Sequence, residues 1–151
     1  MSTASVGTIR REVVSLRTTP GEWDCIDVTD QLDEAVRLTE GFALIHTPHT
    51  SACILIGEND DELMLDYHRV WGTLLAAGRP YLHTSHGHLS GEAHVFCALH
   101  GPQVVLPIAG GKLALGKLQR IFFVDPTEGP RDRDIWVYSF GSSSPVQASS
   151  E

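Results

Sequence analysis

The chain of 151 residues lacks the features that define several protein classes. It holds only three cysteines, Cys25, Cys53 and Cys97, each in an apolar segment and none in a CxxC spacing. Cysteine-rich zinc sites are therefore excluded, and we expect reduced, buried thiols and a cytoplasmic location. No GxGxxG or GxxxxGK follows a predicted strand, so dinucleotide-binding and P-loop units are not supported.

Positive charge and long apolar runs are also scarce. The 11 Lys and Arg residues form no cluster, and the formal net charge is -8. Nucleic-acid binding depends on neutralising phosphates, so we expect no nucleic-acid partner. No apolar run is long enough to cross a bilayer, and the first residues lack the apolar centre of a signal peptide. We therefore expect no membrane partner.

The length predicts a single domain, over residues 8–141, between a flexible N-terminus (residues 1–7) and a flexible C-terminal tail (residues 142–151). Apolar, β-prone segments predict strands over residues 8–16, 23–28, 42–46, 51–57, 104–109, 118–124 and 135–140. Apolar residues at helical spacing predict a helix capped by Thr29 or Asp30 and a second helix from Asp61, and residues 92–100 a short third. This order predicts an α+β fold with a largely antiparallel β-sheet.

The stretch from Leu44 to Asn59 concentrates the polar chemistry. Two apolar segments meet at a Thr-Pro-His-Thr-Ser corner, where Pro48 fixes the backbone and indicates a turn. The second segment ends on Glu58. As a carboxylate that leaves an apolar strand, Glu58 is a candidate general acid or base. The alternative is that Glu58 caps the helix that begins near Asp61.

Histidines are abundant, with eight in the chain. His49, His83 and His94 come from three segments, each beside a turn or a helix start. Three imidazoles with a fourth position left open are typical of a catalytic zinc site, whereas isolated histidines are more often surface or structural residues. Arg131 and Arg133 follow a Gly-Pro turn and are candidates for binding phosphate or carboxylate, or for a surface ion-pair cluster.

Several motifs, taken in order, resemble those of the YjbQ family, whose members are labelled secondary thiamine-phosphate synthases. The match covers roughly residues 8–141, and Leu118 departs from it because the family usually carries tryptophan there. The matching segments are HTSA at 49–52, GEN at 57–59, Asp66, YLH at 81–83, AH at 93–94, LPI through IFFVD at 106–125, GPRDR at 129–133 and Gly141.

The resemblance implies a homotrimer that buries strand edges and has sites near its subunit boundaries. It implies a divalent metal on His49, His83 and His94, for which imidazole ligands favour zinc over magnesium. Glu58 would be catalytic. The residues expected to bind the substrate, a small phosphorylated molecule, are Thr50, Ser51, Asn59, Gln119 and Arg131.

The activity that the resemblance implies is the coupling of hydroxymethylpyrimidine pyrophosphate to a thiazole phosphate. Diphosphate departure is usually assisted by magnesium, however, and three imidazoles fit that ion poorly. Two alternatives therefore stay open. One is a metal-dependent hydrolase, with Glu58 as proton shuttle for a metal-bound water. The other is a non-catalytic trimer that binds a metal or a small molecule.

Overall fold

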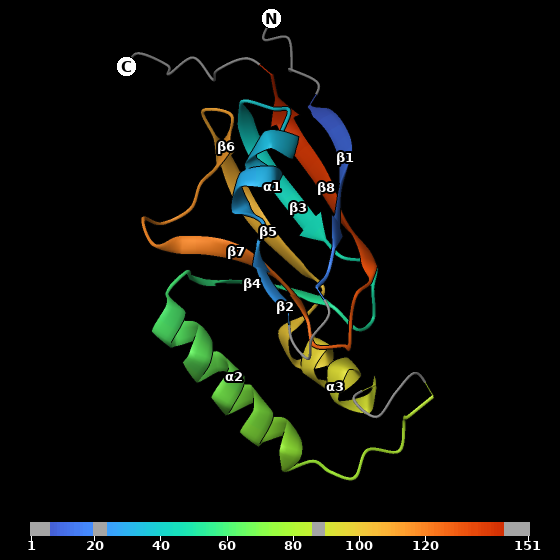
Figure 1. Cartoon of the computed structure of the whole chain (residues 1–151). Helices are drawn as coiled ribbons and strands as arrows, with labels where there is room; N and C mark the ends of the chain where they lie inside the picture. The colour runs from blue at the N-terminus through green and yellow to red at the C-terminus, as the bar shows by residue number, and fades with distance from the viewer. Residues whose placement is uncertain (1–6, 20–23, 86–89, 144–151) are drawn as a thin grey trace, which may run out of the picture.

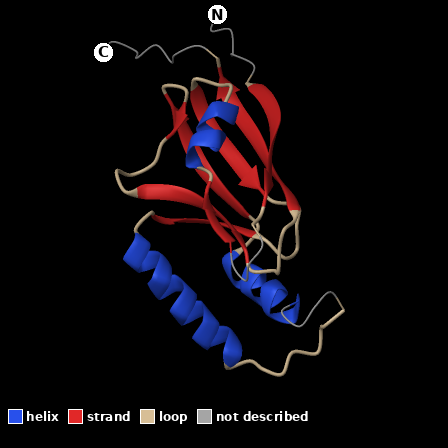
Figure 2. Cartoon of the chain, viewed as in Figure 1, coloured by secondary structure: helices blue, strands red, loops and turns tan. Residues whose placement is uncertain are grey.

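Two antiparallel sheets and three helices form the part of the chain that the computed structural model describes, residues 7–19, 24–85 and 90–143 (Figures 1 and 2). The predicted α+β class with antiparallel strands is confirmed. Residues 1–6 and 144–151, from the predicted flexible ends, lie outside the described residues. In chain order the elements are β1 (Thr8–Arg17), β2 (Asp24–Asp27), α1 (Thr29–Ala35), β3 (Glu40–His46), β4 (Cys53–Glu58), α2 (Asp61–Ala76), α3 (Ser90–His100), β5 (Gln103–Ala109), β6 (Lys112–Leu113), β7 (Gln119–Asp125) and β8 (Asp132–Ser142).

The larger sheet has the strand order β1-β8-β3-β5-β6, and the smaller sheet has the order β2-β7-β4. Gly110 and Gly111, with φ of 59° and 82°, form the tight turn between β5 and β6, a geometry that glycine adopts readily. Gly41 of β3 lies directly opposite Gly141 of β8. A Cβ atom on either of these two would overlap the backbone of the facing strand, so both positions require glycine.

The core occupies the space between the sheets. Along β8, Ile135 and Val137 are buried and alternate with residues that point the other way, as the two-residue period of a strand requires. They pack against the smaller sheet and α1, which Figure 1 shows lying over this face of the larger sheet. A second cluster lies under α2 and α3, where Trp71 stacks on Tyr67 at 4.9 Å between ring centroids and meets Phe96 edge-on.

The opposite face of the larger sheet, here called the outer sheet face, is apolar although no described element covers it. Ile9, Phe42 and Val105 are 66, 54 and 60% exposed. A water-facing side of an antiparallel sheet is usually polar, so this composition is unusual. The outer sheet face consists of Ile9, Arg11, Val13, Phe42, Leu44, His46, Val105, Pro107, Trp136, Tyr138 and Phe140, which the strand register places side by side.

The helices differ in detail from those predicted. The expected side-chain cap on α1 is wrong: Val28 occupies the N-cap position and no side chain caps the helix. Thr29 instead donates from its hydroxyl to Asp27 at 2.7 Å and accepts from the amide of Ile121 at 2.8 Å, which ties α1 to β7. None of the described helices is long and apolar enough to cross a membrane.

Candidate functional site

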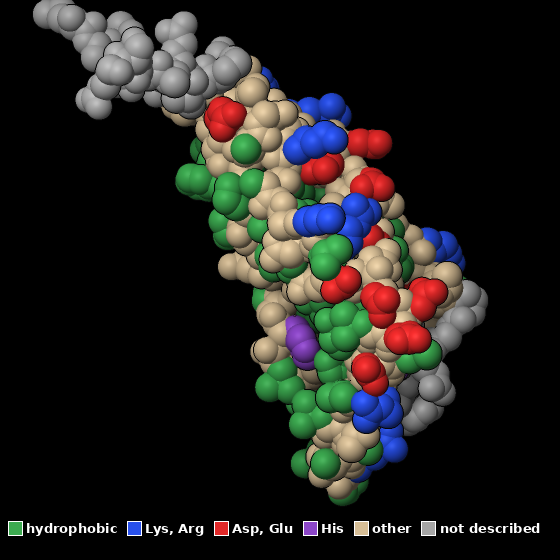
Figure 3. Space-filling view, turned by 90° about the vertical axis from the view of Figure 1, so that its left-hand side faces the viewer, with side chains coloured by type: hydrophobic (Ala, Val, Ile, Leu, Met, Phe, Trp, Pro, Cys, Tyr) green, Lys and Arg blue, Asp and Glu red, His purple; other side chains and the backbone are tan. Residues whose placement is uncertain are grey.

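A cavity of about 450 Å³ lies at the corner between β3 and β4, beside α3. Its walls combine three imidazoles, those of His46, His49 and His94, with mainly apolar side chains. A concave, mostly apolar site with a few convergent polar groups is the usual form of a small-molecule site. Figure 3 shows one face of the molecule, on which hydrophobic side chains lie among charged ones. The lining residues are His46, Thr47, Pro48, His49, Thr50, Ala52, His94, Cys97, Ala98 and Pro102.

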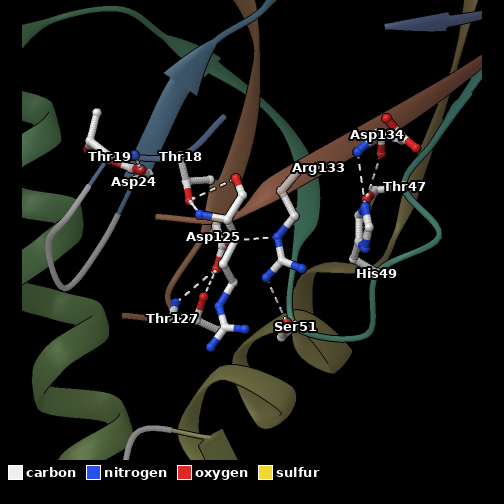
Figure 4. Close-up of polar contacts among 11 residues, drawn as sticks. Thr18, Thr19, Asp24, Thr47, His49, Ser51, Asp125, Thr127, Arg133 and Asp134 are labelled. Carbon is white, nitrogen blue, oxygen red and sulfur yellow. Dashed lines mark hydrogen bonds and ion pairs between the residues drawn. The ribbon is translucent and has the colours of Figure 1, made fainter. Parts of the chain in front are cut away.

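The backbone of β8 fixes His49. The amide of Asp134 donates a hydrogen bond of 2.9 Å to Nε2 of His49, as Figure 4 shows. A ring nitrogen that accepts a hydrogen bond carries no proton, so the proton of the neutral ring resides on Nδ1. Burial, followed by the nearby charge of Arg133, lowers the pKa of His49 below its usual value. His49 is therefore a neutral imidazole that presents an N–H donor.

A backbone group also sets the tautomer of His94, which α3 carries. Its Nδ1 lies 3.0 Å from the carbonyl oxygen of Thr50. A carbonyl oxygen only accepts hydrogen bonds, so Nδ1 of His94 carries the proton and Nε2 holds the lone pair of the neutral ring. The ring of His83 meets the ring of His94 edge-on, with 5.0 Å between their centroids. Thr50 thus contributes its backbone to the site.

A buried polar network joins Ser51, at the corner, to Arg133 of β8 (Figure 4). Arg133 donates to Asp125 at 2.6 Å and to the hydroxyl of Ser51 at 3.1 Å. The side chains of Arg133 and Asp125 are only 10 and 1% exposed. Asp125 also accepts from the amide of Thr127 at 2.9 Å. Ser51 is therefore tied to β7 and β8, and the surface ion-pair cluster considered for Arg133 is instead a buried pair.

His46 is a cavity residue that none of the sequence motifs indicated. This residue ends β3, its ring lies 5.7 Å from that of Trp136, and its Nδ1 is buried without a hydrogen-bond partner among the described residues. The position of His46 in β3 could have indicated where its ring points. Ala43 and Ile45 point into the core, so the two-residue period directs His46 to the outer sheet face.

Glu58, Asn59 and Gln119 lie at the other end of β4 from the histidines. The strand β4 alone, from Cys53 to Glu58, spans roughly 17 Å at the rise of an extended strand. Glu58 is exposed and pairs in register with Gln119. Its expected partial desolvation is therefore wrong. The alternative cap is also wrong, because Asp60 caps α2 by accepting from the amide of Leu63 at 2.9 Å.

The other expected substrate contacts are engaged elsewhere or remain open. Asn59 donates to Asp27 at 3.1 Å, and Gln119 accepts from the amide of Gly116 at 2.8 Å. Thr18 holds the backbone of Arg131 at both its amide (2.8 Å) and its carbonyl (2.9 Å), while the Nε of Arg131 is buried without a partner among the described residues. Arg131 thus keeps donors for a ligand.

The three expected metal ligands do not form one centre. In His49 the ring nitrogen left open, Nδ1, carries the proton and so has no lone pair for a metal, whereas His94 keeps the lone pair of Nε2. Only the rings of His83 and His94 face each other. Across the described ranges, no three His, Cys, Asp or Glu side chains converge as a metal site would require. The three histidines therefore do not converge as a metal centre within the described residues, and the divalent metal stays a prediction.

Comparison with known proteins gives relatives over most of the chain. An Archaeoglobus fulgidus UPF0047 protein is 37% identical over 114 residues, which is 76% of this chain and 89% of that protein. A YbjQ-like protein of unknown function from Sulfolobus solfataricus P2 superposes with a TM-score of 0.82 at 27% identity, over 91% of this chain and 100% of that one. An uncharacterised YjbQ/UPF0047 protein from Clostridium acetobutylicum gives 0.74 at 32% identity, over 83 and 97%.

These findings correct the expected activity. The curated relatives are named only as UPF0047 proteins, and the Sulfolobus structure is described as of unknown function. None of them carries a thiamine-phosphate synthase description, and the described part of the chain lacks the convergent three-histidine set on which that reaction, or metal-dependent hydrolysis, was expected to depend. The expectation of a thiamine-phosphate synthase at a three-histidine metal site is therefore wrong.

The family itself is clear. The model of the family described as UPF0047 protein YjbQ-like matches residues 12–142, from β1 to the end of β8. That range includes both sheets, the three described helices and all the residues that line the histidine cavity. The motifs that pointed to YjbQ thus lie on one continuous fold, and the chain belongs to the UPF0047, YjbQ-like family.

Proposed function

We propose that the chain is an enzyme that carries out acid–base chemistry on a small carbonyl compound held in the histidine cavity. One observation supports this most directly: His49 and His94 line the same cavity, and their backbone hydrogen bonds leave different ring nitrogens open, Nδ1–H on His49 and Nε2 on His94. Nδ1–H of His49 is a neutral donor, and Nε2 of His94 is a base. A neutral imidazole donor paired with a separate base is an arrangement that suits proton removal beside a carbonyl group.

The proposed step uses both rings. Nε2 of His94 takes a proton from the carbon next to the carbonyl, and the electron pair of that C–H bond moves to form an enolate. Nδ1–H of His49 donates a hydrogen bond to the oxygen on which the negative charge develops. The mainly apolar walls, which include Ala52 and Pro102, lower the local polarity and so strengthen this hydrogen bond. His94 then returns the proton to carbon.

Deuterium exchange tests this proposal directly, because it detects removal of the proton whatever product the enolate goes on to form. The protein is incubated in D₂O with a panel of small 2-oxo acids, ketones and aldehydes, and loss of each C–H signal is followed by NMR. We expect exchange of at least one compound, reduced by about 10²–10⁴-fold in His94→Gln. Exchange of every compound no faster than in imidazole buffer would overturn the proposal.

A matched pair of variants tests whether the cavity is the place of reaction. Ala98 is exposed and lines the cavity, whereas its neighbour Leu99 is 65% exposed and lies outside the lining. Ala98→Trp should fill the cavity and abolish exchange, and Leu99→Trp should preserve it. Equal exchange by both variants would place the chemistry elsewhere.

We also propose that the chain assembles as a homotrimer through the outer sheet face. A contiguous apolar surface of this kind is typical of a protein–protein contact. The contact surface that we propose for the trimer is thus a sheet face, whereas the expectation from the sequence was that strand edges are buried. Light scattering should give a trimer for the wild type and for Leu65→Glu, an exposed position on α2, but a smaller species for Phe42→Glu. A wild-type monomer at micromolar concentration would refute assembly.

A cytoplasmic location completes the proposal. Cys25, Cys53 and Cys97 are all free, and Cys53 and Cys97 are buried in the cluster under α2 and α3. Free thiols are usual in a reducing compartment. Fractionation of cells that express the untagged protein would test this location, and recovery outside the cytoplasm would exclude it.

A further inference from the structure

The segment Arg79–Ser85, here called the strap, leads away from α2 toward α3 and is anchored in a glycine-lined slot. The hydroxyl of Tyr81 donates to the carbonyl of Leu75 at 2.9 Å. A Cβ atom on Gly78 would lie 2.6 Å from that hydroxyl oxygen, and one on Gly91 would lie 2.7 Å from Cβ of Tyr81. Neither glycine has a positive φ, so space and not backbone conformation explains the absence of a side chain.

A second anchor is an ion pair. Both Nε and Nη2 of Arg79 donate to the carboxylate of Glu92, in the first turn of α3. The side chain of Glu92 is only 9% exposed, whereas that of Arg79 is 57% exposed. A buried carboxylate is stable only with such a partner, so the pair fixes the strap to the start of α3.

The strap determines where His83 lies. Tyr81 is held in the slot, Leu82 is 97% exposed, and His83 meets His94 edge-on. The backbone oxygen of His83 would lie only 3.0 Å from a Cβ on Gly91, so this part of the strap rests directly on α3. Edge-to-face contact between rings restricts the orientation of both planes.

We infer that the strap is a positioning device for His94. The ring of His94 is held from one side by the carbonyl of Thr50 and from the other by His83, and His83 is in turn held by Tyr81 and by the Arg79–Glu92 pair. The strap thereby keeps Nδ1 of His94 on Thr50 and leaves Nε2 for the substrate. Gly91, Tyr81 and Arg79 act through His83 and are positioning residues. This inference rests on the proposed role of His94.

Two glycine substitutions form a matched test. Gly91→Ala inserts a methyl group beneath Tyr81 and His83 without changing any polar group, whereas Gly72→Ala, within α2, meets no atom within 4 Å. The tautomer of His94 is read from its ring ¹⁵N shifts, and the deuterium exchange of the best substrate is measured in parallel. We expect Gly72→Ala to match the wild type in both.

In Gly91→Ala we expect a mixture of His94 tautomers and exchange slowed by about 10²-fold, the cost of a misplaced group. Arg79→Lys keeps a positive charge beside Glu92 but loses the two-point contact, so it should shift the same two readouts and carries the test if Gly91→Ala does not fold. Wild-type tautomers in the folded variants would overturn the inference. A mixed tautomer in a protein whose wild type exchanges no substrate would uphold the strap and refute the proposed function.

Discussion

Removing the charge of Arg133 should lower the free energy of unfolding by more than the loss of an exposed ion pair would. Arg133→Met leaves the carboxylate of Asp125, 1% exposed, without its counter-ion. Removing one partner of a buried pair costs about 3–5 kcal/mol. Thr127 still donates to Asp125 with its amide, so we expect the lower end of this range, about 3 kcal/mol. For a protein of this size that corresponds to a fall in Tm of roughly 6–12 °C.

The assay is urea unfolding followed by tryptophan fluorescence, with two comparison variants. Arg17→Met breaks the ion pair with Asp132. The side chains of Arg17 and Asp132 are 61 and 82% exposed, so this change should cost at most about 1 kcal/mol. The double variant Asp125→Asn, Arg133→Met removes the unpaired charge, so it should be more stable than Arg133→Met alone. The reasoning is refuted if Arg133→Met costs no more than Arg17→Met, or if the double variant is the less stable one.

Three further predictions concern single side chains. Burial and the charge of Arg133 lower the pKa of His49 in the folded state. The contribution of His49 to stability is therefore complete above the unfolded pKa of 6.5 and is lost as the pH falls through the lower folded pKa. Thermal melts over a pH series should show this loss in the wild type and not in His49→Gln. Glu58→Gln, at an exposed position without a capping role, should change the free energy of unfolding by less than about 0.5 kcal/mol, and a larger loss in urea unfolding would contradict its placement. Inorganic phosphate should raise the Tm of the wild type but raise it much less in Arg131→Lys, because lysine cannot present the planar fork of the guanidinium; equal shifts would exclude Arg131 as an anion contact.

The fold could be predicted from the sequence where the pattern is local. The spacing of Leu63, Tyr67 and Trp71 predicts α2, because one helix face must be buried. The β-prone segment 135–140 predicts the strand β8. The cap of α1 could not be predicted, since the hydroxyl of Thr29 is used by β7, which is remote in sequence.

The candidate site was predicted only in part. His49 and His94 were identified and both line the cavity, but Glu58 was grouped with them because it is close in sequence. Residues that are close in sequence lie far apart in space when an extended strand joins them, as β4 does here. Pairing of Arg133 with Asp125 depends on how β7 meets β8, and the tautomers depend on two backbone groups. Neither leaves a pattern in the residues themselves.

The facing glycines Gly41 and Gly141 have a consequence for the chemistry at the far end of β8. They fix the register of β3 against β8, because a slip by one residue would bring a side chain into a gap that holds only hydrogen atoms. Such a slip would move the amide of Asp134 by roughly 3.3 Å. That amide lies 2.9 Å from His49, so the hydrogen bond that sets its tautomer would be lost. The tautomer of His49 thus depends on two residues without side chains, about seven strand positions away.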